Sequence, residues 1–179
     1  SILPFLYEMV GRQRRIAKRQ GITMNVNVLR SESLGSIHVK SADPAEAPAI
    51  KFNFLSSQHD RDGLLAAMRK GRELMATSPV AEMTGEEIAP GIDKQTDEEL
   101  LEWVRNNAET TYHPVGTCKM GSDPMAVVDA QLRVHGIEGL RIADASIMPT
   151  LTSGNTNAPS IMIGEKCAAM ILAASEDHM

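Results

Sequence analysis

A histidine followed directly by a proline stands in residues 112–121, which have the sequence YHPVGTCKMG. Because an imidazole ordinarily changes protonation state near neutral pH, His113 is suited to act as a general acid or base. Pro114 disfavours helical backbone at His113, and Gly116 allows the chain to turn sharply just beyond it. We therefore treat His113 as a candidate acid–base residue. A structural histidine, bonded to a backbone carbonyl, fits the same pattern equally well.

The two cysteines give weaker signals. His113 and Cys118 are too few ligands for a closed zinc site, and Cys167 lies far along the chain, so we predict no metal site. A Cys118 nucleophile with His113 as its base would need proximity in space, which the spacing does not establish. A buried small thiol is the simpler interpretation of Cys118. Two cysteines make no disulfide framework, and reduced thiols favour a cytoplasmic location.

A second candidate segment is residues 153–159, with the sequence SGNTNAP. Its glycine and asparagines allow unusual backbone geometry, and Pro159 suits the first turn of a following helix. A helix N-terminus presents free N–H groups and the positive end of the helix dipole, which together favour an anion. Ordinary helix capping would produce the same pattern, so both interpretations stay open here.

Three segments must provide the sheet that positions these loops. Residues 22–29, 36–40 and 48–54 alternate apolar and polar side chains, as half-buried strands do. Their short connections favour antiparallel pairing. Residues 1–21 form a weakly patterned lead-in, and residues 140–143 form a short apolar strand that ends at Asp144.

Helices are predicted at residues 58–76, 96–107 and 160–174, from apolar side chains at helical spacing. In the second of these, Thr96 is a suitable N-cap and Glu99 completes a capping box. Residues 82–92 are expected to be a loop.

Composition narrows the possible functions. The 179 residues fit one domain or one domain plus part of another, and the net charge of −5 argues against a nucleic-acid partner. The basic run at residues 12–19 is local and is best explained as a solvated helix face or loop. No apolar run approaches the roughly 20 residues of a membrane span. The chain begins at Ser1 with apolar residues, which we interpret as a fragment entered within a domain.

Three segments in order resemble the C-terminal signature of the glucose-methanol-choline (GMC) flavoprotein oxidoreductases. They are residues 113–121 (HPVGTCKMG), 139–149 (GLRIADASIMP) and 153–159 (SGNTNAP). Residues 34–44 (LGSIHVKSADP) also resemble a strand and turn of that family. The chain most resembles the choline dehydrogenase and alcohol dehydrogenase branch.

The resemblance implies FAD-dependent oxidation of a primary alcohol, choline-like or aliphatic, to the aldehyde. His113 would be the active-site histidine that takes the hydroxyl proton while hydride leaves for flavin N5. Asn155 matches a second active-site position, where a carboxamide can orient the substrate oxygen. Two further pairs of residues match positions that contact the cofactor: Asp144 and Ala145 toward its phosphate and ribityl region, and Asn157 and Ala158 toward the flavin ring.

One departure from the family is informative. The strand–Gly-x-Gly-x-x-Gly–helix unit that binds the adenosine half of FAD is absent from this sequence. The resemblance therefore implies that this chain is the C-terminal portion alone. Its FAD site would be incomplete without its partner, the N-terminal FAD domain. The chain would then be inactive by itself. We expect a substrate-binding domain at residues 1–132 and a piece of the FAD domain at residues 133–179.

The predicted fold class is α+β: an antiparallel sheet with flanking helices, plus a terminal strand, loop and helix that belong to the FAD domain. A homo-oligomer is compatible with this prediction, and no membrane association is expected from it. The alternative function is a non-catalytic, stand-alone binding or assembly domain derived from the same fold, because a fold does not guarantee an activity.

Overall fold

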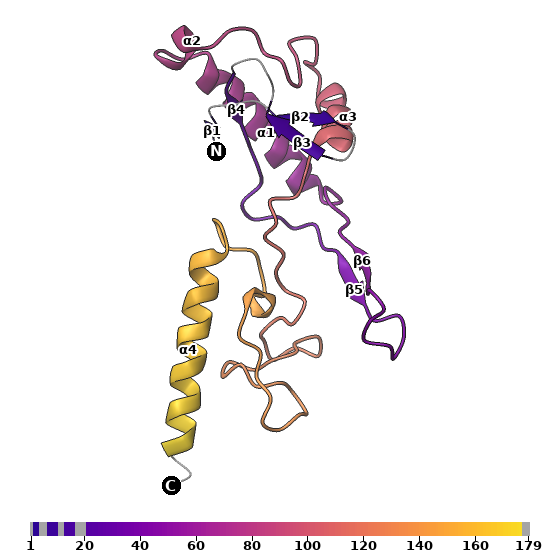
Figure 1. Cartoon of the computed structure of the whole chain (residues 1–179), viewed down its shortest axis with the longest axis vertical. Coiled ribbons are helices and arrows are strands. Elements are labelled where there is room, and N and C mark those ends of the chain that lie inside the picture. The colour runs from indigo at the N-terminus through magenta and orange to yellow at the C-terminus, as the bar shows by residue number, and fades with distance from the viewer. Residues whose placement is uncertain (1, 4–6, 11–12, 17–20, 177–179) are drawn as a thin grey trace. The chain divides into compact units, whose positions relative to one another are not determined.

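The computed structural model describes residues 2–3, 7–10, 13–16 and 21–176 (Figure 1). The chain divides into two compact units, which are described separately below. Unit 1 comprises Ser1–Val28 and Leu55–Glu109, and unit 2 comprises Leu29–Phe54 and Thr110–Met179. Helices and antiparallel strand pairs occur together, which confirms the predicted α+β class. The division at residue 132 concerned the domains of a longer enzyme and stays a prediction.

Unit 1 holds two antiparallel strand pairs. Strand β1 (Ile2–Leu3) pairs with β4 (Thr23–Met24), and β2 (Tyr7–Val10) pairs with β3 (Gln13–Ile16). Residues 1–21, expected only as a weakly patterned lead-in, therefore include the strands β1, β2 and β3. Backbone ladders need no alternating side-chain pattern, so this sequence signal was weak. Part of the basic run forms β3, and its other residues lie outside the described ones.

The alternating segment 22–29 forms a ladder only over β4, but its two faces are as predicted. Val26 and Val28 are half-buried, whereas the asparagines between and before them are exposed. A Cβ atom added at Gly71 would lie 3.6 Å from Val26 Cγ1, and one added at Gly63 would lie 3.4 Å from Val28 Cγ2. The apolar face of this segment therefore packs against a helix rather than forming part of a wide sheet.

That helix is α1 (Gln58–Met75), and it contacts both α2 (Val80–Met83) and α3 (Asp97–Asn107). The predicted helices at residues 58–76 and 96–107 are confirmed. The loop predicted at residues 82–92 was wrong for its first two residues, which belong to α2. The buried apolar side chains of the two longer helices are Leu65 on α1 and Leu100 and Val104 on α3.

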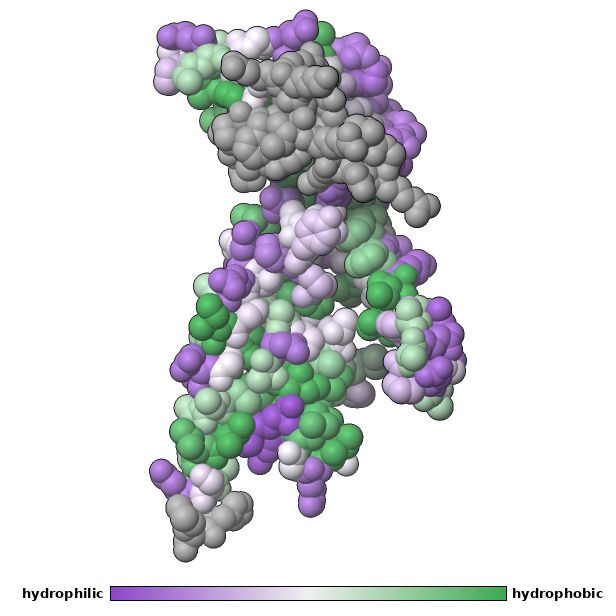
Figure 2. Space-filling view, in the orientation of Figure 1, coloured by the Kyte–Doolittle hydropathy of each residue, from purple (hydrophilic) through white to green (hydrophobic). Residues whose placement is uncertain are grey.

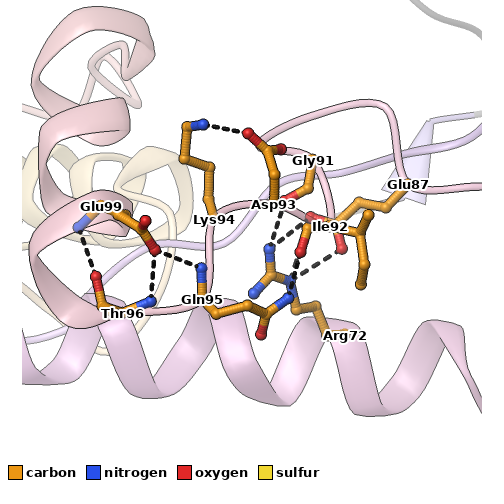
Figure 3. Close-up of polar contacts among 9 residues, drawn as sticks. All are labelled: Arg72, Glu87, Gly91, Ile92, Asp93, Lys94, Gln95, Thr96 and Glu99. Carbon is orange, nitrogen blue, oxygen red and sulfur yellow. Dashed lines mark hydrogen bonds and ion pairs between the residues drawn. The ribbon is translucent and has the colours of Figure 1, made fainter.

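The capping box predicted at the start of α3 is present (Figure 3). Glu99 N donates to Thr96 Oγ1 at 3.2 Å, and Thr96 N donates to Glu99 Oε2 at 2.9 Å. The backbone N–H groups of Thr96 and Gln95 bond the Glu99 carboxylate and hold its pKa below the ordinary value. Two orphan groups of the helix terminus are thus satisfied by its own sequence.

A two-pronged ion pair fixes the loop after α2 to α1 (Figure 3). Arg72 Nε and Nη2 each lie 2.9 Å from a Glu87 carboxylate oxygen, and Nη2 also donates to the Gly91 carbonyl at 3.1 Å. Both charged side chains are only 24% exposed. Because a bidentate guanidinium–carboxylate pair has fixed geometry, it holds residues 87–91 against the helix.

Unit 2 contains the third strand pair, a hairpin of β5 (Ser36–His38) and β6 (Ala49–Lys51). Both strands are shorter than predicted, and all six residues are exposed. At Gly35 the two arms approach so closely that an added Cβ would lie 2.2 Å from the Lys51 carbonyl oxygen. Only glycine therefore fits the entrance to this hairpin.

The core of unit 2 lies between the loops of residues 115–148 and helix α4 (Asn157–Glu176). Its loops are joined by isolated β-bridges, one of which pairs Arg133 with Arg141 in the expected strand 140–143. Helix α4 starts three residues earlier than predicted. The buried core residues are Val128, Leu132, Ile147, Met148, Ile163 and Cys167.

Much of α4 is exposed. Ile161, Met162, Ile171 and Leu172 are each about half exposed or more, and Figure 2 shows green apolar patches along this helix interrupted by purple polar ones. Among the described residues, α4 alone has a length and composition that would allow it to cross a membrane. This revises our expectation of no such segment, which missed it because charged Glu165 and Lys166 interrupt the apolar residues.

Candidate functional site

The two loops singled out in the sequence meet in unit 2. His113 Nδ1 lies 2.8 Å from Thr156 Oγ1, although the two residues are 43 positions apart. His113 is half-buried and Thr156 is buried, and Thr156 directly follows Asn155. The predicted acid–base residue therefore lies against the loop that carries the predicted carboxamide.

Backbone hydrogen bonds hold the segment after His113 in place. Gly116 has a φ of 86°, which is the sharp turn that the sequence predicted. Beyond the turn, Cys118 N donates to Ser146 O at 3.0 Å and Met120 N donates to Ile147 O at 2.8 Å. The histidine segment is thus fastened to the short 3-10 helix η1 (Ala145–Ile147).

The loop at residues 153–159 is fixed at both ends. Arg30 Nε donates to Ser153 Oγ at 2.6 Å, and Thr152 Oγ1 donates to Gly154 O at 3.3 Å. At the other end, the Thr156 carbonyl accepts a hydrogen bond from Ser160 N at 3.0 Å, which starts α4. Asn155 is exposed between these anchors. Its carboxamide is therefore open to a ligand.

The predicted cofactor-contacting residues lie on two neighbouring elements, because η1 contacts α4. Asp144 caps η1: its Oδ1 accepts from Ser146 N at 2.7 Å, and the residue is exposed. Ala145 packs against the core of the unit. Asn157 and Ala158 are exposed in the first turn of α4. Their backbone N–H groups precede the first i→i−4 bond of a helix and so have no intrahelical acceptor.

Other residues of the histidine segment have structural surroundings. Cys118 is a half-buried free thiol, and Cys167 is a free thiol buried in the core. Lys119 Nζ lies 2.9 Å from both carboxylate oxygens of Asp123. This ammonium holds the pKa of the Asp123 carboxyl below its usual range. The lysine of the motif therefore forms a surface ion pair.

Two residues at this site were missed by the sequence analysis. Thr156 was treated as part of a loop because the following helix was expected to begin at residue 160. A threonine just before a helix is a common N-cap, which is the signal that could have singled it out. No sequence pattern links Arg30 to Ser153, because their contact depends on the fold.

The residues present fit one end of a flavin. The exposed N–H groups at the start of α4 and the positive end of its dipole suit a group that gains negative charge. Asp144 keeps its second carboxylate oxygen, Oδ2, as a further acceptor next to this end, since the hydrogen bond from Ser146 N uses Oδ1. N–H donors and a carboxylate acceptor are groups that can hydrogen-bond a flavin ring edge and a polyol chain.

Comparison with known proteins identifies the family. Residues 31–164 match the family model described as GMC oxidoreductase, which is most of the chain. The chain belongs to the GMC oxidoreductase family.

The similar proteins support this GMC assignment. The chain is 53% identical over 154 residues to a curated relative, the oxygen-dependent choline dehydrogenase of Escherichia coli O45:K1. A fungal aryl-alcohol oxidase has 34% identity and a TM-score of 0.75 over 83% of this chain. An FAD-dependent oxidoreductase from Chaetomium thermophilum has 29% identity and a TM-score of 0.74 over 79% of the chain.

The matches cover only part of each relative. They include 86% of this chain but 27% of the choline dehydrogenase, and 25% of each of the two solved structures. The chain therefore corresponds to about a quarter of a GMC oxidoreductase, and it contains the histidine segment and the loop before α4.

Proposed function

We propose that the protein to which this chain belongs oxidises a primary alcohol to an aldehyde, with FAD as the hydride acceptor and His113 as the group that takes the hydroxyl proton. The observation that carries the proposal is the 2.8 Å contact between His113 Nδ1 and Thr156 Oγ1. It brings an imidazole and the Asn155 loop to the N-terminus of α4. An acid–base group can take the hydroxyl proton, and a carboxamide and N–H donors can stabilise the charge that develops.

Each residue has one task in the proposed reaction. The alcohol hydroxyl gives its proton to the His113 imidazole as the C–H bond breaks. The Asn155 side chain, which is exposed, donates an N–H to the substrate oxygen and orients the carbinol carbon. Bound FAD supplies an acceptor for the two electrons and the hydrogen of that bond. The N–H groups of Asn157 and Ala158 would hold its ring, and Asp144 would hold its polyol region.

The substrate class rests on the similar proteins. The curated relative is named a choline dehydrogenase, and one solved neighbour is an aryl-alcohol oxidase. Both names describe an alcohol as substrate, and 53% identity favours the choline-like class first. Short aliphatic primary alcohols are the second choice, because only the hydroxyl must reach His113.

The rest of the FAD site is assigned to a partner segment. Because the chain matches only 27% of the choline dehydrogenase, we propose that an N-terminal FAD-binding portion completes the site. The 179-residue chain alone is then expected not to oxidise alcohols and to bind FAD weakly. Titration of FAD into this chain, with and without that portion, measures the two affinities for FAD. Tight binding of FAD by the chain alone would contradict an incomplete site.

The main experiment measures turnover of choline and of 1-butanol by the complete protein and its His113→Ala variant. Loss of a general acid–base group is expected to lower kcat by at least about 100-fold. Flavin absorbance of the purified variant verifies that FAD is still bound.

His135→Ala is the matched control. His135 also belongs to unit 2, is exposed, and has its Nε2 3.1 Å from the Gly121 carbonyl. Its removal is expected to leave turnover near the wild-type value. Near-normal turnover by His113→Ala would refute the proposed role. No alcohol oxidation by a flavin-loaded wild-type protein would favour the alternative of a non-catalytic binding domain.

A further inference from the structure

Thr156 contacts the His113 imidazole at one of its two ring nitrogens. The distance of 2.8 Å from His113 Nδ1 to Thr156 Oγ1 is typical of a hydrogen bond, and the threonine is only 8% exposed. A hydrogen bond that is buried on one side is shielded from competing water. It is therefore more effective in fixing a ring than an exposed one.

The Thr156 backbone is fixed independently of the histidine. Its carbonyl accepts from Ser160 N at 3.0 Å and from Ser160 Oγ at 2.7 Å. Helix α4, which follows, is anchored in the core of unit 2 by Ile163 and Cys167. The Thr156 hydroxyl is thus held by the helix and the core, and it provides a fixed point for the imidazole.

The neighbouring sequence accounts for the contact that this hydroxyl makes. A threonine at the N-cap commonly accepts a hydrogen bond from a backbone N–H two or three residues later. Here the hydroxyl bonds the ring of His113. Three residues after Thr156 stands Pro159, which has no N–H to donate, so the hydroxyl is available to the imidazole ring.

The contact also bears on which ring nitrogen can take a proton. A neutral imidazole has one N–H and one nitrogen with a free lone pair, and the Thr156 hydroxyl can bond Nδ1 in either form because a hydroxyl both donates and accepts. If Nδ1 donates its proton to Thr156 Oγ1, the lone pair is on Nε2, on the far side of the ring. Only in that form can Nε2 accept a proton from an alcohol.

We infer that Thr156 is a positioning residue, which holds His113 with its proton on Nδ1 and leaves Nε2 to accept the substrate proton. This inference rests on the proposed function, because it assigns the atom through which His113 acts. It makes Thr156 part of the site without contact to the substrate.

The tautomer can be measured by ¹⁵N NMR of the imidazole nitrogens in the 179-residue chain, which needs no flavin. The wild-type ring is expected to show its neutral form protonated at Nδ1. Thr156→Val keeps the shape but removes the hydroxyl, and the Nε2-protonated form should increase. Thr156→Ser keeps the hydroxyl and should restore the wild-type spectrum. Thr84→Val is the control, because that hydroxyl belongs to unit 1 and bonds the Val80 carbonyl instead.

In the complete protein, Thr156→Val is expected to lower kcat roughly tenfold through misplacement of the base, with a smaller change in KM, and Thr156→Ser should recover most of it. A wild-type ring protonated at Nε2, or a tautomer that Thr156→Val leaves unchanged, would overturn the inference. The His113→Ala result distinguishes a failure of the positioning role of Thr156 from a failure of the proposed function. If that variant is inactive while Thr156→Val keeps both kcat and tautomer, only the positioning role fails; if His113→Ala is active, the proposed function fails.

Discussion

Replacement of Gly116 by alanine tests whether the turn after His113 depends on left-handed backbone. Gly116 has a φ of 86°, and an added Cβ would lie 3.4 Å from the Met148 carbonyl oxygen, which is close to an ordinary contact. The expected cost therefore comes mainly from the backbone, at about 1–2 kcal/mol for a residue with a side chain in this conformation.

Two other glycines of unit 2 separate backbone strain from other effects. Gly136 has a φ of 77° with no atom within 4 Å of an added Cβ, so Gly136→Ala should cost as much as Gly116→Ala. Gly154 has equally open surroundings without a positive φ. Gly154→Ala should therefore be neutral, or stabilise by about 0.4–1 kcal/mol through a less flexible unfolded chain.

The buried Cys167 thiol provides the assay. It is 5% exposed on α4, within the same core as Met148, so a thiol reagent reaches it only when the core of unit 2 opens. The rate at which the reagent modifies Cys167 is measured by site-resolved mass spectrometry. It should be about 5 to 30 times higher in Gly116→Ala and Gly136→Ala than in the wild type, because a loss of 1–2 kcal/mol raises the population of the opened state by that factor. Trp103 fluorescence, which reports on unit 1, should not change. Equal labelling rates in Gly116→Ala and Gly154→Ala would refute the reasoning.

Two further predictions concern charged groups. Glu87→Gln breaks the bidentate pair with Arg72 and should lower the free energy of unfolding of unit 1 by about 1–3 kcal/mol, measured by Trp103 fluorescence in urea. Glu73→Gln, in a pair whose two side chains are about two-thirds exposed, should have no measurable effect; equal effects would contradict the argument. At Asp129, burial tends to raise the pKa of the carboxyl. Hydrogen bonds from the backbone and guanidinium of Arg133 and from the backbone N–H of residue 131 outweigh this effect. The pKa of Asp129 is therefore lowered. Its contribution to stability is therefore fully present above the unfolded pKa of about 3.9 and is lost as pH falls through the lower folded value. The stability difference between wild type and Asp129→Asn, followed by far-UV circular dichroism in urea, should shrink over that acid range, and a difference independent of pH would exclude this linkage.

The sequence predicted those helices and strands whose signal lies within a few neighbouring residues. Thr96 and Glu99 predicted the start of α3 because a capping box needs only residues three positions apart. The alternation at residues 22–29 predicted the correct faces, but the extent of the ladder depended on a partner strand only two residues long. The length of a ladder depends on both strands, so the alternation in one strand does not predict how many residues pair.

The same distinction applies to the candidate site. The resemblance of the segments around His113, Asp144 and Asn155 to the family's C-terminal signature was sufficient to predict a GMC oxidoreductase, which the family match over residues 31–164 confirms. The sequence did not predict the contact between His113 and Thr156, the anchoring of Ser153 by Arg30, or the exposure of one face of α4. Each of these depends on where distant segments lie after folding, and hydrogen bonds and burial are decided by that geometry. The sequence by itself thus determined which groups are available for chemistry, and the tertiary structure decided which of their atoms meet.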